Sequence, residues 1–565
     1  IEVREDDVYV GLEAEPEHER TVTDVMAETM VAWGVTHVFG MVGHSNLGLA
    51  DAVRRVCEEG KQTFIGIRHE GAAAFAASAF GKLTGEPAAC LTIAGPGATN
   101  LLTGLWDAKV DRSPVLALTG QVHQQVFGPG AFQELPLKEA FSAVADFSHL
   151  VLPASNHAEL MSLAVKSAVT HQSVAHLIFP DDVQTLPAGA DADAGSPEGR
   201  IAPAQIAPPV EALGQALAML RGAQRPVIIV GHGARFDMDA VIGLAESLNA
   251  PVLTTFKAKG IIGDGHPLAG GVLGRSGTPV ASWLMNEADV LLVLGASFSN
   301  HTGITPSKPI IQVDSERAQI AKFHSVDAPV WGDLGVTCGF LQKELEGHAT
   351  FDQRADVAAR WQIWRDEKQA RLSDDRGRGV SSSAVFDSMT RRVPENAIIS
   401  VDVGNHAYSF GRYFETSGRH SILMSGYLGS IGFGYPAAMG AWAATQVKGR
   451  WEGRFEGRPV VTVTGDGGFG QYPWEINTAV KYGMNITHVL LNNGELGKIS
   501  KEQRAGAWDV WQTSLTNPNI AEFVTSCGGL GIRVTSAEDL DDALDRALAH
   551  DGPATVEVMT DAELI

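Results

Sequence analysis

The chain has 565 residues, 44% of them hydrophobic, and a formal net charge of −23, so its length predicts roughly three or four globular domains. The acidity argues against a nucleic-acid partner, because such binding needs a basic surface, and the lack of any run of 18 apolar residues argues against a membrane partner. Four dispersed cysteines without a C-x-x-C pair indicate neither a zinc site nor disulfides, which is typical of a cytoplasmic protein.

The elements predicted along the chain are apolar strands that alternate with amphipathic helices. This order predicts an α/β protein with doubly wound parallel sheets, in which ligands bind beyond the carboxyl ends of the strands. Stretches rich in small residues, Gly and Pro, and one charged helical stretch, divide the chain. The predicted parts are a polar arm at 1–20, a first domain at 21–187, a linker at 188–209, a middle domain at 210–346, a connector at 347–379 and a third domain at 380–565.

In the first domain, polar side chains follow the predicted strands. Thr21 has the pattern of a helix-capping residue, and His44 and Ser45 lie in a turn after the first strand. Glu70 follows an apolar strand at 63–67 and opens an alanine-rich helix. Ser45 and Glu70 also have a structural interpretation. A Ser can cap the start of a helix, and the helix dipole stabilises a carboxylate at the helix N-terminus.

The third domain contains the motif with the clearest chemistry. One apolar strand enters GDGG at 465–468, and the next enters Asn492-Asn493. Both loops leave the carboxyl ends of parallel strands, so Asp466 and Asn493 can converge although they are 27 positions apart. Their oxygens, with the backbone carbonyl of Glu495, suit Mg²⁺, which takes its remaining ligands from phosphates and water. A lone GDG also occurs as an ordinary turn, so further motifs are needed.

Five strings together resemble one family, the pyruvate oxidase and acetolactate synthase superfamily, which depends on thiamine diphosphate (ThDP). GDGG followed by NN resembles its cofactor motif. The similarity extends from Thr21 to the end of the chain. The other four strings are RHEGA at 68–72, GPGATN at 95–100, AFQE at 131–134 and GSIGFG at 429–434.

The resemblance implies three α/β domains, which are pyrimidine-binding, middle and diphosphate-binding. Asp466, Asn493 and the Glu495 carbonyl are expected to hold Mg²⁺ and, through it, the diphosphate. Glu70 is expected to bond the pyrimidine and promote the imino tautomer that deprotonates the thiazolium carbon. Ile431 is expected to lie between the two rings. Further expected cofactor contacts are Gly95, Asn100, Asn405, His406, Gly429, Ser430, Gly465, Gly467 and Gly468, and expected substrate contacts are His44, Ser45, Phe132, Gln133, Lys498 and Glu502.

The reaction implied is ThDP- and Mg-dependent decarboxylation of a small 2-oxo acid such as pyruvate, with transfer of the acyl or aldehyde unit to an acceptor, as in an acetolactate-synthase-like carboligase. The alternatives are an FAD-dependent pyruvate oxidase and a non-catalytic regulatory homologue, and the intact Glu70, Asp466 and Asn493 argue against the latter. Sites in this superfamily form between two subunits, so the resemblance implies a homodimer or homotetramer. Lys498 stands where relatives often carry an apolar residue and is expected to meet an anionic substrate group.

The middle domain leaves the question of FAD open. Its predicted strands alternate with helices, but the turn GHGAR at 231–235 lacks the full spacing of a dinucleotide loop. Residues 257–262 and 274–275 resemble the FAD-binding domain of pyruvate oxidases, whereas FSNHTG at 298–303 replaces an Asp-Arg pair of flavin-binding acetolactate synthases. In the third domain, VKGRWEGRFEGR at 447–458 is expected to be an exposed loop of mixed charge.

Overall fold

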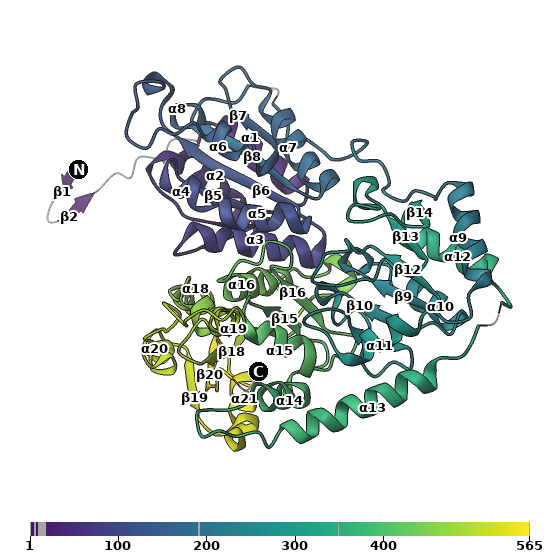
Figure 1. Ribbon diagram of the computed structural model, residues 1–565. Helices are drawn as coiled ribbons and strands as arrows, with labels where there is room; N and C mark the ends of the chain where they lie inside the picture. Colours follow the sequence, from purple (N-terminus) through teal and green to yellow (C-terminus); the bar gives the residue numbers. More distant parts are fainter. Residues whose placement is uncertain (1, 5–6, 10–17, 190–191, 349, 564–565) are drawn as a thin grey trace.

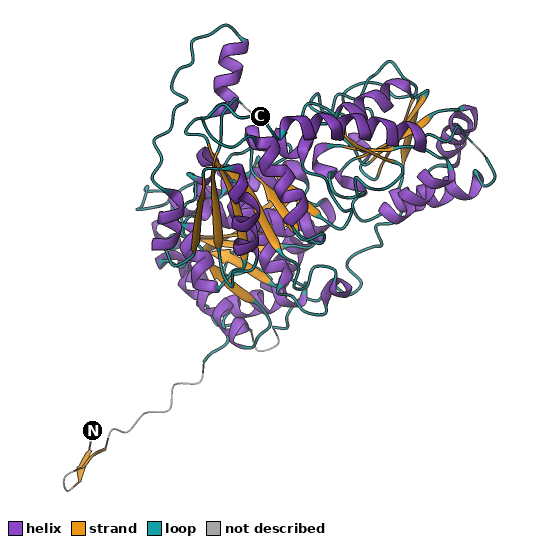
Figure 2. Ribbon diagram, turned by 90° about the horizontal axis from the view of Figure 1, so that it is seen from below, coloured by secondary structure: helices purple, strands orange, loops and turns teal. Residues whose placement is uncertain are grey.

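The computed structural model describes residues 2–4, 7–9, 18–189, 192–348 and 350–563. It confirms an α/β fold with three sheets, each of six parallel strands, and Figure 2 shows helices on both faces of these sheets. Ahead of them, β1 (Glu2–Arg4) pairs antiparallel with β2 (Asp7–Tyr9). Much of the arm predicted at 1–20 lies outside the described residues. No described helix is both long and apolar enough to cross a membrane.

The first sheet has the strand order β4-β3-β5-β6-β8-β7, so β4 forms one edge. The first helix begins as expected, because Thr21 and Asp24 cap each other's backbone N–H groups. The strands are β3 (His37–Gly40), β4 (Thr63–Gly66), β5 (Ala88–Thr92), β6 (Val115–Gln121), β7 (Ala145–Leu150) and β8 (Val174–Pro180). The helices are α1 (Val22–Ala32), η1 (His44–Asn46), α2 (Leu47–Glu58), α3 (Glu70–Thr84), α4 (Pro96–Asn100), α5 (Leu102–Asp111), η2 (Gln124–Val126), α6 (Leu137–Phe141), α7 (His157–His171) and α8 (Asp181–Gln184).

The middle sheet has the order β11-β10-β9-β12-β13-β14. Its strands are β9 (Pro226–Val230), β10 (Val252–Thr254), β11 (Ala269–Val272), β12 (Val290–Leu294), β13 (Ile310–Asp314) and β14 (Ala328–Trp331). Its helices are α9 (Val210–Gly222), η3 (His232–Ala234), α10 (Met238–Ser247), η4 (Phe256–Ala258), α11 (Pro279–Glu287), η5 (Arg317–Gln319) and α12 (Leu334–Glu344). The connector is helical, as predicted, with α13 (Arg354–Arg371) running from the middle sheet towards the third domain (Figure 1).

The third sheet has the order β16-β15-β17-β18-β20-β19, which places β17 beside β18. Its strands are β15 (Ile398–Val401), β16 (Ser421–Met424), β17 (Val460–Gly465), β18 (Ile486–Asn492), β19 (Leu530–Val534) and β20 (Ala554–Met559). Its helices are α14 (Ser382–Arg392), α15 (Asn405–Tyr413), α16 (Gly434–Thr445), η6 (Arg450–Gly453), α17 (Asp466–Phe469), α18 (Glu475–Tyr482), α19 (Gly497–Ala505), α20 (Ile520–Ser526), η7 (Ala537–Asp539) and α21 (Leu540–Leu548).

Helices α3 and α16 join the first and third domains, and they lie side by side in Figure 1. Both are rich in small residues, and α3 is buried along its whole length. A Cβ added at Gly440 of α16 would lie 2.1 Å from the Ala76 carbonyl oxygen of α3, so the two backbones are nearly in contact. Only small side chains permit this spacing, which fixes the two domains closely against each other.

A buried cluster of four charges connects all three domains. The Lys82 ammonium lies 2.7 Å from Asp107 and 2.8 Å from Asp111, and Lys257 of the middle domain lies 2.6 Å from Asp111. The Gly426 backbone N–H of the third domain also donates to Asp111. A buried charge is tolerated when it is paired and hydrogen-bonded, and here two cations and two carboxylates compensate one another.

The segment at 447–458 differs from the expected exposed loop. Phe455 is only 3% exposed, and the Trp451 ring packs edge-on against Phe80 of α3. Arg450 also forms an ion pair of 2.5 Å with Glu86 of the first domain. The segment is rich in charges, which suggested full exposure, but its two aromatic side chains turn inward. Arg458 is also partly buried, and it donates to the carbonyl oxygens of Asn396 and Ala397.

Candidate functional site

The GDGG and NN loops meet at one edge of the third sheet. Strands β17 and β18 are parallel neighbours, with Gly465 paired to Leu491, so the loops leave the same end. The Gly494 N–H donates a 3.0 Å hydrogen bond to Oδ2 of Asp466. Leu496 and Leu515 would both lie within 3.4 Å of a Cβ added at Gly467, so the loop passes close to its neighbours there.

Asp466 supplies a buried carboxylate at this edge. It is 5% exposed, and burial raises the pKa of its carboxyl group. A second hydrogen bond to Oδ2, of 2.7 Å, comes from the Asn517 amide, which also donates to Asn492. Asn517 was not identified from the sequence, because it follows Asp466 by 51 positions and belongs to no motif.

The oxygens around Asp466 fit a hard cation. The Asn493 amide oxygen lies in the next loop, where it accepts from the Glu495 N–H at 3.1 Å. In the described ranges, no group of three or more His, Cys, Asp or Glu could hold a metal ion. A site built on Asp466 therefore has to add amide and carbonyl oxygens and outside ligands, which is the donor set that Mg²⁺ accepts with a diphosphate.

An unpaired amide next to these loops suits an anion. Asn405 begins α15, and its buried Nδ2 has no hydrogen-bond partner among the described residues. A Cβ added at Gly497 would lie 2.8 Å from this atom and 2.9 Å from Nδ2 of Asn493, so only glycine fits between the two amides. A buried donor without a partner is costly, and a ligand oxygen would satisfy it. The structure thus offers an anion a donor beside the oxygens of Asp466 and Asn493.

His406 and Asp402 are buried residues that pack against the GDGG and GSIGFG loops. Burial lowers the pKa of His406 to about 4, so its ring is neutral, and its Nε2 lies 2.9 Å from the Asp402 carbonyl oxygen. The Asp402 carboxylate accepts the N–H of Gly432, and a Cβ added at Gly468 would lie 2.3 Å from its Oδ2. Asp402 therefore holds the GSIGFG loop against the GDGG loop. The sequence places it only at a strand end and gives no sign of this role.

The GSIGFG loop carries an exposed apolar side chain. Ile431 is 39% exposed, although its neighbours Gly432 and Phe433 are buried. Gly429 has a φ of +69°, which glycine adopts easily, and the Ser430 N–H donates to the side chain of Ser425. An exposed Ile presented by a fixed loop fits contact with an apolar ring.

Four candidates of the first domain lie together. Glu70 is the first residue of α3 and is 8% exposed, and the Asn100 amide donates to its Oε2 at 2.9 Å. The GPGATN turn passes close by, since a Cβ added at Gly97 would lie 3.3 Å from Oε1 of Glu70. A Cβ at Gly95 would lie 2.9 Å from the Gln133 Cβ, which brings the AFQE loop onto this turn.

The AFQE loop presents two unusual side chains. Gln133 has a φ of +65°, and its Oε1 is buried without a partner among the described residues. Phe132 is 81% exposed and stacks on His44, with 6.4 Å between ring centroids. Glu134 fixes the loop by accepting the N–H groups of Gly128, Ala131 and Gly130, and these hydrogen bonds lower the pKa of its carboxyl group.

The remaining substrate candidates differ in what they contact. Ser45 is 2% exposed, and its Oγ accepts from the Ala94 N–H at 2.9 Å. The hydroxyl therefore makes a hydrogen bond within the first domain and does not face solvent. Lys498, on α19, lies 4.6 Å from the centre of the Tyr408 ring and 3.1 Å from Oε1 of Glu502. Glu502 is exposed. Lys498 therefore has a partner already, but one that solvent can replace.

The candidates thus form two groups, one around Glu70 in the first domain and one around Asp466 in the third. In the part of the chain that the structure describes, no hydrogen bond or ion pair joins a candidate of one group to a candidate of the other. Each group also presents an exposed apolar side chain, Phe132 or Ile431. Neither group alone contains all the residues that the sequence assigned to the site.

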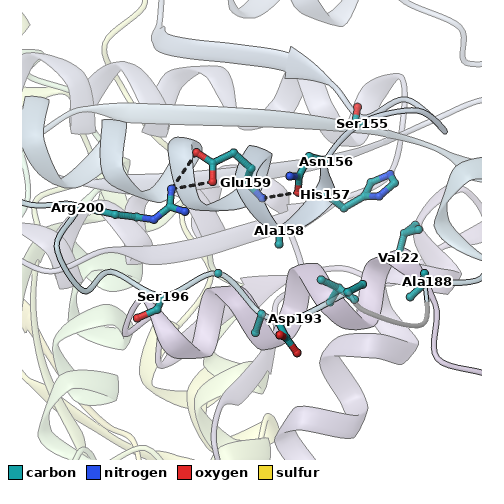
Figure 3. Close-up of a pocket in the computed structure, with 15 residues that line it drawn as sticks. Val22, Ser155, Asn156, His157, Ala158, Glu159, Ala188, Asp193, Ser196 and Arg200 are labelled. Carbon is teal, nitrogen blue, oxygen red and sulfur yellow. Dashed lines mark hydrogen bonds and ion pairs between the residues drawn. The ribbon is translucent and has the colours of Figure 1, made fainter.

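A pocket of about 490 Å³ lies elsewhere, between α1, the start of α7 and the linker (Figure 3). Its wall includes Arg200, which forms an ion pair of 2.7 Å with Glu159. None of the candidate residues lines it. This pocket is therefore separate from the chemistry described above.

Comparison with known families identifies all three domains. Residues 20–141 match the N-terminal TPP binding domain of thiamine pyrophosphate enzymes, residues 213–341 match their central domain, and residues 402–558 match their C-terminal TPP binding domain. Thiamine pyrophosphate is another name for ThDP. Each match falls on one of the three parallel sheets, although β7 and β8 of the first sheet and β15 of the third lie outside the matched ranges.

Comparison with individual proteins gives relatives over nearly the full length. YdaP of Bacillus subtilis, named as a thiamine pyrophosphate-containing protein, is 34% identical over 96% of this chain and 92% of its own. The acetolactate synthase isozyme 2 large subunit of Escherichia coli is 30% identical over 94% of each chain. The pyruvate oxidase of Lactiplantibacillus plantarum is 27% identical over 94% of this chain and 87% of its own.

Proposed function

The chain belongs to the thiamine pyrophosphate enzymes, and on this premise we propose that it binds ThDP with Mg²⁺ and decarboxylates a small 2-oxo acid, passing the acyl or aldehyde unit to an acceptor. The observation that carries the proposal is that one sheet edge holds both the buried Asp466 carboxylate and the Asn405 amide, whose Nδ2 has no hydrogen-bond partner among the described residues. The first is a ligand for a cation and the second a donor for an anion. A magnesium diphosphate needs both.

In this proposal, Asp466, Asn493 and the Glu495 carbonyl hold Mg²⁺, and Asn405 donates to the diphosphate. The backbone N–H groups at the GDGG turn add further donors, as is common where a loop opens a helix. His406 is neutral and buried, so it supports the loop without adding charge. When bound, ThDP supplies a carbon nucleophile and takes up the electrons that decarboxylation releases.

Glu70 is proposed to exchange a proton with the pyrimidine ring of the cofactor. Its burial and its hydrogen bond from Asn100 restrict the carboxylate to one orientation. Ile431 is proposed to support the rings from the third domain. Phe132 and Ile431 would add apolar surface to the site, which favours loss of CO₂ because the charged carboxylate gives way to a less charged product of the step.

A second copy of the chain is proposed to complete the site. Within the described part of one chain, no hydrogen bond joins the group of Glu70 to the group of Asp466, and each group exposes an apolar side chain, Phe132 or Ile431. Pairing the Glu70 group of one copy with the Asp466 group of another would cover both. The protein is therefore proposed to be a homodimer or homotetramer.

An FAD-dependent pyruvate oxidase remains the second candidate, because of one feature in the middle domain. The loop after β9 contains two buried nitrogens, His232 Nε2 and Arg235 Nε, without partners among the described residues. Burial lowers the pKa of Arg235 to about 10, so the guanidinium remains cationic at neutral pH and suits a phosphate. A yellow purified protein with a flavin absorbance band would favour this candidate.

The proposal is tested with the purified protein, ThDP, Mg²⁺ and a panel of 2-oxo acids. CO₂ release and carboligation products are measured with and without a chelator, and ThDP binding is measured by calorimetry. We expect turnover that requires both ThDP and the metal. Tight ThDP binding without turnover of any acid would favour a regulatory homologue, and no ThDP binding at all would refute the proposal.

A further inference from the structure

Helix α18 of the third domain covers the segment that leads to Glu70 in the same chain. That segment follows β4, which is an edge strand of the first sheet, so its outer N–H groups have no neighbouring strand among the described residues. The Tyr482 hydroxyl, at the end of α18, accepts from the Gly66 N–H at 2.7 Å. At the start of α18, Oε1 of Glu475 accepts from the N–H groups of Arg68 and His69, at 3.0 Å each.

Glu475 is a buried carboxylate whose hydrogen bonds serve this segment. It is 1% exposed, and burial raises the pKa of its carboxyl group. Apart from the two backbone N–H groups, it accepts from the Thr478 hydroxyl at 2.7 Å. Hydrogen bonds to a carboxylate are shorter and stronger than neutral ones, and they lose little to solvent when the site is buried.

Tyr472, in the turn before α18, contacts the residues on either side of Glu70, which are His69 and Gly71. The Tyr472 ring lies edge-on to His69, with 5.2 Å between ring centroids. A Cβ added at Gly71 would lie 2.5 Å from the Tyr472 hydroxyl, so the backbone on the far side of Glu70 has no freedom to move outward. Contacts from one element of the third domain therefore extend on both sides of Glu70.

We propose that Glu475 is a positioning residue, which fixes the backbone of Arg68 and His69 and thereby the direction in which the Glu70 carboxylate points. The role rests on the proposed function of Glu70. Glu475 touches neither cofactor nor substrate in this proposal. A displacement of about 1 Å at a reacting group can lower the rate on the order of a hundred-fold. A gain of this size explains why a buried carboxylate would be kept at this position.

The first test is hydrogen exchange measured by mass spectrometry on the cofactor-free protein. Three variants are compared with the parent: Glu475→Ala, Glu475→Gln and, as a matched control at the other end of α18, Tyr482→Phe. In Glu475→Ala we expect the amides of Arg68 and His69 to exchange at least about ten-fold faster, since each loses a charge-assisted hydrogen bond. Glu475→Gln keeps an oxygen acceptor and should protect them nearly as well as the parent.

The second test is steady-state kinetics with ThDP and Mg²⁺. Glu475→Ala should lower kcat about ten- to a hundred-fold, with KM and ThDP affinity within about three-fold of the parent. Glu475→Gln should recover most of this loss. Tyr482→Phe should loosen only Gly66 and leave kcat within about three-fold.

Unchanged exchange at 68–69 in Glu475→Ala would overturn the proposal, and so would faster exchange with an unchanged kcat. If Glu475→Ala does not fold, Glu475→Gln decides the test. A kcat of Glu475→Gln as low as that of a Glu70 variant would contradict the role of Glu475 as a hydrogen-bond acceptor. A parent that turns over no 2-oxo acid would refute the proposed function instead. Because the exchange measurement needs no cofactor, it still shows whether Glu475 holds the segment.

Discussion

Asn100 donates a hydrogen bond of 2.9 Å to Oε2 of Glu70, although the two residues are 30 positions apart and belong to different helices. The bond connects the GPGATN turn with the start of α3. It requires an acceptor oxygen at Glu70, which the carboxyl group provides. The pair therefore holds Glu70 in one orientation before any ligand is bound.

Replacing Glu70 should remove turnover and leave cofactor binding. In Glu70→Ala we expect kcat to fall about a hundred- to ten-thousand-fold, the range that general acid–base catalysis contributes. ThDP affinity, measured by calorimetry, should stay within a few-fold because the proposed diphosphate contacts all lie in the third domain. Glu139→Ala, which removes an exposed carboxylate of the same domain, serves as the control. Activity of Glu70→Ala close to that of the parent would contradict the assigned role.

Replacing Asp466 should weaken Mg²⁺ and ThDP together. In Asp466→Ala the cation loses its only charged protein ligand, and the diphosphate loses the cation. Asn517→Ala should have a smaller effect on ThDP affinity, since it removes one hydrogen bond to Asp466 and keeps the carboxylate. Calorimetric titrations of ThDP at several Mg²⁺ concentrations distinguish the two. Unchanged ThDP affinity in Asp466→Ala would exclude this metal site.

Lys498 should act on the choice of substrate. Its present partner, Glu502, is exposed, so an anionic group of a substrate can compete for the ammonium. In Lys498→Ala we expect KM to rise much more for 2-oxo acids with a second carboxylate than for pyruvate, because a charge pair is lost. Lys501→Ala, an exposed lysine on the same helix, is the control. An unchanged order of KM values across the panel would show that Lys498 does not select the substrate, and His44 and Gln133 would be examined in the same assay.

Asp402 should make stability depend on pH. Burial raises the pKa of Asp402 to about 7, so the folded protein binds this proton more tightly than the unfolded chain does. Stability should therefore fall as the pH rises from ~4 to ~7 and level off above that, by on the order of a few kcal/mol. Asp402→Asn removes the titration, so in melting experiments on cofactor-free protein it should gain on the parent between pH ~5 and pH ~8. Parallel pH profiles of the two proteins would contradict this expectation.

The 447–458 segment should contribute to stability despite its charges. Phe455 is 3% exposed, and truncating a buried Phe costs about 3–5 kcal/mol. Phe455→Ala should therefore lower the melting temperature clearly. Glu452→Ala, an exposed position in the same segment, should not. Equal melting temperatures of both variants would mean that the aromatic packing adds little.

The sequence predicted those parts of the site that follow from local order. GDGG and NN could be placed together because each follows an apolar strand, and successive parallel strands end at the same edge. The capping pair of Thr21 and Asp24 could also be predicted, because it depends on only four consecutive residues. Asn517 and Asp402 could not be predicted as supports of the site, because their contacts arise where distant loops meet. Ser45 likewise lies where a loop residue was expected, but its hydroxyl faces Ala94 and not the open edge.

The charge cluster around Asp111 has a consequence for cutting the protein into pieces. Lys257 and the Gly426 N–H, two of the partners of Asp111, come from other domains. A fragment that ends at the first domain would keep Asp107 and Asp111 with Lys82 alone, and it would expose to water the side of α3 that α16 covers in the whole chain. Such a fragment should be poorly soluble, because α3 is rich in apolar side chains. The three sheets are separate units of architecture, but the first domain is expected to need the other two for its solubility.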